Sequence, residues 1–518
     1  MFKRQLEINN FLKGTLYVTI AVVITKILGV MYKIPLSYIL GDEGMGYFNS
    51  AYAIYGFIYI LCTAGVPKAM SLAIAEYDSR NSDISSYYIL KYALKLFFKV
   101  GTIATLFSLF IAPFIVKIIG NDKAYYSIIA VSPAVLFVTL SGVIRGYLNS
   151  EERLSIIAVS QLLEALIKLL CGLFLAYVAV RIGLSLPMIS AMAIVGITIG
   201  SIITFVYMLT RVHFNNKDNN LKQNCIIEKK HLRTTLVKTA LPISIGSAVL
   251  NITAVLDLIL MMKHLVTLGF SESEASAAYG NYTTLAVPML NLVISLITPI
   301  TLAYLPKLSH VYCKNDKDGF DSLSRGILCI VNAISIPSAL AFYFYSFDIL
   351  DILFSVTSAA LGGQMLSALS FGVLLLSLLT AVNTYLEAQG KVRITVLSLL
   401  LGAFAKTLVT AFLISKFGIM GAPIGTVFSY FVSLSISLLA LGMCGNKIPV
   451  FKYTFAFAVF GIVSFLPIYF LIYARGVIRN ALLSVFVCVG TSGLLYLMLL
   501  YGAYAFAVRR NNIEFAQK

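Results

Sequence analysis

The sequence contains no tryptophan, few charged residues and only four histidines. Charged residues make up 12% of its 518 positions, about half of what a soluble surface needs, whereas 59% are hydrophobic and the mean hydropathy is +0.91. This composition excludes a soluble globular protein and indicates an all-α protein that crosses a membrane many times. Its interfacial aromatic residues must come mainly from the 30 tyrosines.

Cysteine and histidine are too scattered to suggest a metal site or a disulfide framework. The seven cysteines stand singly, and the four histidines lie far apart with no zinc-binding spacing. We therefore expect no metal and no cofactor. The first apolar stretch is about twice as long as the core of a signal peptide and lacks a cleavage site, so we expect it to remain as a membrane helix.

Fourteen apolar stretches are long enough for the roughly 20 residues of one helical crossing. They lie at about 12–40, 46–77, 94–118, 125–148, 154–181, 188–210, 235–263, 278–308, 326–347, 363–388, 394–416, 422–443, 453–474 and 481–507. Alternate connections hold most of the 39 Lys and Arg residues, and basic connections remain in the cytoplasm. The pattern predicts 14 transmembrane helices with both termini cytoplasmic. It also explains the net charge of +17 without a nucleic-acid partner.

An internal repeat divides the chain. The segment YLNSEERLSIIAVSQLLEALIK at 147–168 aligns without a gap to YLEAQGKVRITVLSLLLGAFAK at 385–406, which places Lys168 over Lys406. A weaker alignment of 12–16 with 237–241 places Lys26 over Asn251. Six spans in each half give both halves the same direction through the membrane, as in parallel-repeat transporters.

The longest polar interruption and largest basic run separates the two halves. It reads RVHFNNKDNNLKQNCIIEKKHLRT and is interpreted as a cytoplasmic linker. The predicted domains follow in chain order: an N-lobe of helices 1–6 at 1–210, the linker at 211–234, a C-lobe of helices 7–12 at 235–443, and helices 13–14 with the C-terminal tail at 444–518.

Two lysines stand inside the first span. Lys26 and Lys33 are seven residues apart and therefore share one helix face. A cation near the bilayer centre costs roughly 2.5–3.5 kcal/mol, so such residues usually face a cavity or an acidic partner. Lys33 could instead extend to the interface, and Lys26 could form a structural salt bridge. Lys68 follows Gly65 and Pro67, which could turn it inward or leave it near the inner interface.

Other charged residues within the spans have predicted structural or coupling roles. Glu164 and Lys168 have the i, i+4 spacing of a helical ion pair. Arg145 is expected to brace a cytoplasmic gate. The remaining candidates for a cavity charge or a coupling-ion site are Asp257, Lys406 and Asn251, although Asp257 and Lys406 would differ in height by roughly 15 Å.

Three stretches carry a family resemblance: 27–77, beginning ILGVMYKIPLSYILGDEGMGYFNSAYAIYGF, 144–169, IRGYLNSEERLSIIAVSQLLEALIKL, and 386–406, LEAQGKVRITVLSLLLGAFAK. The chain resembles the stage V sporulation protein B branch of the polysaccharide transporter family, within the multidrug/oligosaccharidyl-lipid/polysaccharide exporter superfamily. That branch is related to lipid II flippases. The resemblance implies two six-helix lobes that form a V, with two further helices beside the second lobe.

The resemblance also implies a substrate. A lipid-linked oligosaccharide presents a diphosphate, for which Lys26, Lys33 and Lys68 are the predicted binding residues in a central cationic cavity. The leading hypothesis is a flippase for such a precursor, first of all a peptidoglycan lipid II-type substrate, in a bacterial cell membrane. Expected partners are this substrate and membrane lipids, with coupling to Na⁺, H⁺ or the membrane potential, and the chain is expected to be a monomer. The alternatives are a multidrug cation antiporter, which would favour an acidic cavity, and a membrane enzyme, which would need a larger outer loop.

Overall fold

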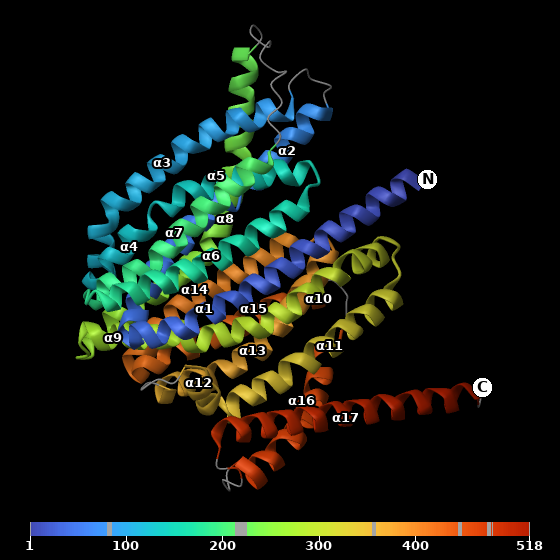
Figure 1. The fold of residues 1–518 in the computed structure, drawn as a ribbon. Helices are drawn as coiled ribbons and strands as arrows, with labels where there is room; N and C mark the ends of the chain where they lie inside the picture. The colour runs from blue at the N-terminus through green and yellow to red at the C-terminus, as the bar shows by residue number, and fades with distance from the viewer. Residues whose placement is uncertain are drawn as a thin grey trace. The chain divides into compact units, whose positions relative to one another are not determined.

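The computed structural model of the chain is built from helices, and the part of the chain that it describes contains no strand (Figure 1). Its backbone is described at residues 2–79, 85–212, 225–354, 359–443, 448–473, 478 and 480–516. The side chains described are those of these ranges except residues 2–19, 225–230, 246, 249, 250, 359, 481 and 504–516. Residues 213–224 of the predicted linker lie outside the described residues.

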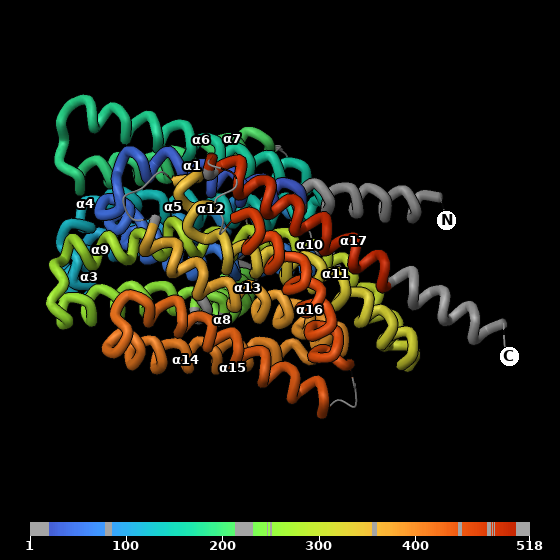
Figure 2. Tube along the Cα trace, turned by 90° about the horizontal axis from the view of Figure 1, so that it is seen from below, coloured from blue at the N-terminus to red at the C-terminus, as the bar shows by residue number. Residues whose placement is uncertain are grey.

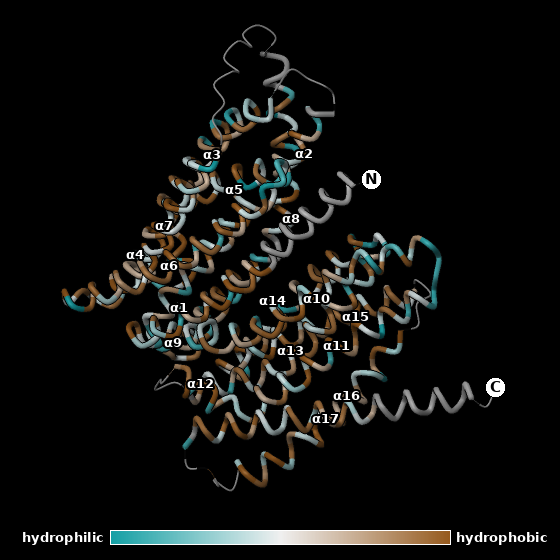
Figure 3. The backbone as a smooth tube through the Cα atoms, turned by 45° about the vertical axis from the view of Figure 1, so that its right-hand side comes forward, coloured by the Kyte–Doolittle hydropathy of each residue, from teal (hydrophilic) through white to brown (hydrophobic). Residues whose placement is uncertain are grey.

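Eleven segments of the described chain are helical, long and apolar enough to cross a membrane. Two of them, Ile20–Tyr77 and Val392–Met443, contain 58 and 52 residues, more than twice the roughly 20 that one crossing needs. Hydrophobic residues run along the lengths of the helices, and hydrophilic residues gather mostly toward their ends and connections (Figure 3). The chain is therefore an all-helical, multi-pass membrane protein, as its composition predicts.

Contacts divide the chain into two compact units, Met1–Gly280 and Asn281–Lys518. The elements of the first unit are α1 (Phe2–Thr63), α2 (Val66–Ser79), α3 (Ser86–Ile119), η1 (Asp122–Ala124), α4 (Tyr125–Val131), α5 (Ala134–Ser150), α6 (Leu154–Arg181), α7 (Leu186–Arg211), α8 (Cys225–Thr267) and α9 (Glu272–Asn281), which ends at the boundary. The elements of the second unit are η3 (Tyr282–Ala286), α10 (Val287–Cys313), α11 (Lys317–Phe344), α12 (Ser346–Phe354), α13 (Ala359–Ala388), α14 (Val392–Phe417), η4 (Gly418–Met420), α15 (Gly421–Met443), α16 (Val450–Ile468), η5 (Tyr469–Tyr473) and α17 (Ala481–Ala516).

Helix α1 consists of two arms that meet at Gly41. This glycine has φ +60° and ψ −174°, a left-handed backbone conformation that residues with a Cβ rarely adopt. The bend allows one continuous helical segment to supply two successive membrane crossings. Side chains of the two arms meet through tertiary packing, as Tyr32 of the first arm does with Phe48 of the second, at 5.9 Å between ring centroids.

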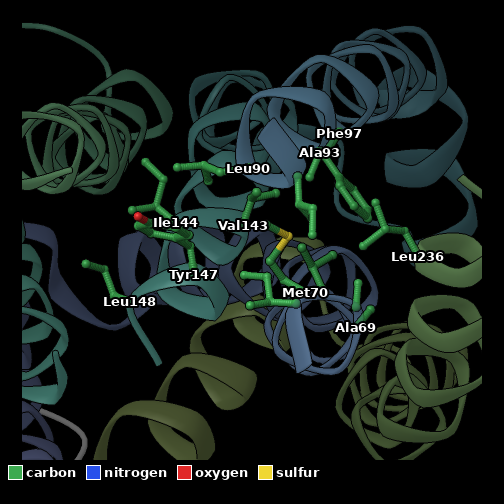
Figure 4. Packing of buried hydrophobic residues seen from close by; sticks show 14 of the residues in the cluster. Ala69, Met70, Leu90, Ala93, Phe97, Val143, Ile144, Tyr147, Leu148 and Leu236 are labelled. Carbon is green, nitrogen blue, oxygen red and sulfur yellow. The ribbon is translucent and has the colours of Figure 1, made fainter. Parts of the chain in front are cut away.

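A buried apolar cluster joins α2, α3, α5, α6, α7 and α8 in the first unit. Met70, Leu90, Val143 and Ile144 are each no more than 1% exposed, and Figure 4 shows their side chains gathered between the helices. Leu236 of α8 belongs to the same cluster. These contacts fix the relative positions of six helices in this unit.

Helix α8 begins the predicted C-lobe, yet it packs against α1, α2 and α3. A Cβ on Gly65 would lie 2.0 Å from the carbonyl oxygen of Ala240, so only glycine permits this approach. The Gly65 N–H also donates to the Ser244 hydroxyl at 3.1 Å. The boundary between the compact units, at Gly280, thus lies further along the chain than residue 235, where the predicted C-lobe begins. A sequence repeat does not determine which neighbours a helix contacts. The two-lobe division itself stays a prediction.

The repeat is visible in the helix boundaries. Helices α5 and α13 end at Ser150 and Ala388, and α6 and α14 begin at Leu154 and Val392. The two end positions are as far apart in the sequence as Lys168 and Lys406, and so are the two start positions. In each unit the following helix then packs along its predecessor, α7 along α6 and α15 along α14 (Figure 2).

Small residues allow both of these helix pairs to approach closely. A Cβ on Gly196 of α7 would lie 2.5 Å from the Cα of Gly172 in α6, and a Cβ on Gly425 of α15 would lie 2.0 Å from the Thr410 hydroxyl in α14. Gly172 and Thr410 are equivalent positions of the repeat. Close approach at small residues is the usual means by which membrane helices gain packing energy.

Candidate functional site

A polar cavity of about 400 Å³ lies within the first unit, between α1, α6, α7 and α8. Three tyrosines of α1, at positions 52, 55 and 59, form one wall because their spacings of three and four residues put them on one helix face. Their ring centroids are 6.1 Å and 5.6 Å apart in succession. The other lining residues are Gly56, Ile60, Glu164, Lys168, Ile197 and Asn251.

The acidic residue of the cavity is paired with an arginine. Arg145 of α5 donates from Nη2 to Glu164 Oε2 of α6 at 2.7 Å, with side-chain exposures of 13% and 24%. Arg145 also hydrogen-bonds Tyr59. The sequence predicts an ion pair of Glu164 with Lys168 and a gate role for Arg145, whereas the structure pairs Glu164 with Arg145. The i, i+4 spacing only permits a pair along α6, whereas a guanidinium from α5 reaches the carboxylate directly.

Lys168 faces the aromatic residues of α1 instead. Its Nζ lies 3.4 Å from the Tyr52 hydroxyl, 4.5 Å from the centre of the Tyr52 ring and 5.4 Å from that of Tyr32. Tyrosine faces attract cations, so these contacts hold the ammonium without neutralising its charge. No ion pair of Lys168 with a carboxylate is found among the described side chains.

A second cation, Lys33, lies outside the lining of the cavity but interacts with Lys168. Lys33, half-buried on the first arm of α1, repels Lys168 electrostatically. The neighbouring Tyr32 is fixed by donating its hydroxyl to the Ala193 carbonyl at 3.1 Å. A Cβ on Gly172 would lie 2.6 Å from that hydroxyl, so the glycine makes room for the ring. Lys168, held beside the Tyr52 hydroxyl, is suited to an anionic group, which would also relieve its repulsion by Lys33.

The remaining predicted residues are distributed over both units. Lys26 of α1 and Lys68 of α2 have exposed side chains and do not line the cavity. Asn251 of α8 does line it, and its amide donates to the Ser247 carbonyl at 3.2 Å. Asp257, 7% exposed, is in α8 of the first unit, while the half-buried Lys406 is in α14 of the second.

The repeat-equivalent position in the second unit is uncharged. Asn383 stands in α13 where α5 has Arg145, and its Oδ1 accepts a hydrogen bond from Ser437 at 2.9 Å. Ser437 also hydrogen-bonds Ser398 of α14 at 2.9 Å. Gly402 replaces Glu164, and a Cβ there would lie 1.8 Å from the Ser433 hydroxyl of α15. In the second unit, packing of α14 against α15 thus fills the space that Glu164 occupies in the first. Lys406 has no acidic residue four positions before it.

A second polar cluster joins the bend of α1 to η1 and α9. The amide of Asn121 donates to Ser50 at 3.2 Å and to Ser276 at 3.4 Å, and all three residues are buried. A Cβ on Gly46 would lie 2.0 Å from the Ser276 carbonyl oxygen. The bend of α1 and the start of α9 are therefore in direct contact, on the side that the charge pattern predicts to be outside.

The site predicted from the sequence includes neither the three tyrosines of α1 nor the contact of Lys168 with aromatic rings. The signal was present, because Tyr52, Tyr55 and Tyr59 repeat at helical spacing in YAIYGFIY. Such a stripe is usually core packing, and only the adjacent cation distinguishes it. Among the described residues no group of three or more His, Cys, Asp or Glu side chains could hold a metal ion.

Membrane-crossing helices around a polar cavity define the class of multi-pass membrane transporters. A family model described as "Polysaccharide biosynthesis protein" matches residues 11–311, more than half of the chain, and the chain belongs to this family. The chain is 24% identical to stage V sporulation protein B of Bacillus subtilis. The alignment spans 480 residues and covers 88% of each chain. It is 22% identical over 443 residues to the lipid II flippase MurJ of the same organism, over 82% of this chain and 81% of that one.

Solved structures agree on the fold. An inward-closed lipid II flippase MurJ superimposes with a TM-score of 0.73 at 16% identity, over 95% of this chain and all of that one. An inward-facing multidrug resistance MATE family transporter of the MOP superfamily gives 0.64 at 14% identity, over 85% and 99%. The chain is thus a transporter with a MATE/MurJ-like fold and not an enzyme.

Proposed function

We propose that this chain moves a lipid-linked oligosaccharide precursor across the cytoplasmic membrane by alternating access, with a peptidoglycan lipid II-type molecule as the leading substrate. Family membership and the similarity to a lipid II flippase support a substrate of this class. We further propose fourteen crossings: each of the two longest helical segments supplies two, and α8 adds one to the described segments. The chain acts as a monomer with both termini in the cytoplasm.

The observation that carries the proposal is the charge of the cavity in the first unit. Its carboxylate, Glu164, is already neutralised by Arg145 at 2.7 Å, whereas Lys168 is held by aromatic faces and repelled by Lys33. Among the residues that line the cavity, the remaining charge is the positive charge of Lys168. A diphosphate supplies the missing negative charge, and the tyrosine and Asn251 side chains offer hydrogen bonds to phosphate or sugar oxygens.

The decisive test is complementation of a bacterial strain depleted of its own lipid II flippase. We expect the wild-type chain to restore growth, Lys168→Gln to fail at equal membrane levels and Lys168→Arg to retain part of the activity, because the positive charge is what the substrate requires. Lys314→Gln, a change of the same type at an exposed site in the second unit, is the matched control and should grow like wild type.

The alternative is export of cationic drugs, which the likeness to a MATE fold makes worth testing. Such a substrate would need an available carboxylate in the cavity. Wild-type protein that fails to complement the flippase strain, yet lowers ethidium accumulation in drug-sensitive cells in a Glu164-dependent manner, would replace the flippase proposal with this one.

Coupling to a driving force needs an ionisable group within the membrane helices. We propose Asp257 and Lys406 as the residues that link transport to Na⁺, H⁺ or the membrane potential, since both are ionisable groups within membrane helices. Transport into proteoliposomes with each gradient imposed alone identifies the driving force. Asp257→Asn should then lose the response to that gradient while substrate binding remains.

A further inference from the structure

A second and larger cavity lies away from the polar one. Its volume is about 750 Å³, and it is formed by residues of α3, α5, α7 and α8 in the first unit. Its apolar walls come from all of these helices but α8: Leu94, Leu96 and Phe98 of α3, Leu140 of α5, and Phe205 and Leu209 of α7. A space of this size with such walls fits part of an acyl chain better than a hydrated solute.

Three cations line the same cavity. Lys95 and Lys99 come from α3 and Arg233 from α8, and no carboxylate is among the lining residues. Lys91 precedes them by one turn, so α3 carries lysines at i, i+4 and i+8, an arrangement that is self-repulsive in an isolated helix. No ion pair of these cations is found in the part of the chain that the structure describes.

The two faces of α3 have different roles. Ala93 and Phe97 point into the buried cluster shared with α2, α5 and α8, so that face holds the helix in place (Figure 4). The lysines are two positions away from them and therefore lie on the opposite, exposed face. The cationic side of the cavity is not needed to hold this unit together.

The positions of Lys95 and Lys99 along α3 match the expected edge of the hydrocarbon layer. Residues 100–119 supply the roughly 20 residues, or about 30 Å, that cross the hydrocarbon layer before the helix ends at Gly120. Lys95 and Lys99 then lie at the level of the opposite headgroups, on the side predicted to be cytoplasmic. A basic pocket between helices at this level is suited to an anionic lipid headgroup.

We propose that this cavity binds one anionic glycerophospholipid of the inner leaflet, with its phosphate at Lys95, Lys99 and Arg233 and an acyl chain along Phe98, Leu140 and Phe205. The site is separate from the proposed substrate cavity and does not depend on the identity of the transported molecule. The bound phosphate contacts both α3, through Lys95 and Lys99, and α8, through Arg233.

The test measures lipid binding to the purified full-length protein by native mass spectrometry in micelles doped with phosphatidylglycerol or, for comparison, phosphatidylcholine. We expect one phosphatidylglycerol to bind with clear preference. Replacing all three cations by glutamine should weaken this binding on the order of a hundredfold, which corresponds to about 1 kcal/mol for each lost charge. The matched control is Lys314→Gln/Lys317→Gln/Arg325→Gln, three exposed cations of the same types in the second unit, and it should retain the bound lipid.

A second variant keeps the test informative if the triple variant does not fold. Phe98 is 52% exposed, so Phe98→Ser should fold normally and weaken phosphatidylglycerol binding several-fold through the acyl wall alone. The proposal is overturned if phosphatidylglycerol binds no better than phosphatidylcholine, or if both triple variants lose it equally. It is also overturned if inorganic phosphate displaces the lipid at equal concentration, because the site would then recognise free phosphate.

Discussion

The pairing of Glu164 can be tested by two double-mutant cycles that share one residue. In the first cycle Arg145→Gln and Glu164→Gln are made singly and together. In the second, Lys168→Gln takes the place of the arginine variant. The structure predicts strong coupling in the first cycle and little in the second, because the Arg145–Glu164 contact is 2.7 Å long and Lys168 lies against Tyr52.

The size of the coupling follows from the geometry. Two unit charges about 3 Å apart attract by roughly 5–6 kcal/mol at an effective dielectric constant of about 20. Each ion's own desolvation cancels in the cycle, so only the solvent screening that accompanies exposures of 13% and 24% reduces this attraction, which leaves a coupling of about 4 kcal/mol. Each single variant should lose about 3 kcal/mol, because it leaves one charge unpaired in a largely buried place. The double variant should be more stable than the sum of the single losses predicts.

The assay is thermal unfolding of the purified protein in one detergent, with guanidinium titration as a second measure. Both single variants should unfold at clearly lower temperature than wild type, and the double variant should recover part of the difference. Additive losses in the Arg145 cycle would refute the ion pair. Coupling of Glu164 to Lys168 of similar size would restore the pair suggested by the i, i+4 spacing.

Three further predictions concern transport and packing. In a protein whose native cysteines are replaced, Ser50→Cys/Ser276→Cys should form a disulfide that stops transport until it is reduced. Full crosslinking with unchanged transport would mean that α1 and α9 do not separate at these residues during the transport cycle. Gly196→Val should lower stability by about 2–3 kcal/mol because its side chain meets the α6 backbone, whereas Gly493→Val, with no neighbouring atom within 4 Å of an added Cβ, should unfold like wild type. Lys26→Ala should reach normal membrane levels and retain growth complementation, since its side chain is exposed and does not line the cavity; loss of complementation at normal levels would instead support the sequence-based prediction that Lys26 binds the substrate.

The sequence determined the class of protein and much of its helical organisation. Hydropathy and span length are local properties, so they identify membrane helices without knowledge of their neighbours. The ungapped repeat aligns Leu154 with Val392, and α6 and α14 begin at these two residues. The family resemblance named from three motifs is confirmed by the family model over residues 11–311.

Only the tertiary structure decided which groups meet. Glu164 has a lysine at helical spacing in the sequence, yet its partner comes from another helix, and Lys168 instead faces tyrosines that belong to α1. Likewise α8 joins the first unit because Gly65 admits the backbone at Ala240, a match between two positions far apart in the chain. Spacing along one helix states which side chains share a face, whereas ion pairs and cavities depend on distances of a few ångströms between helices, which packing sets.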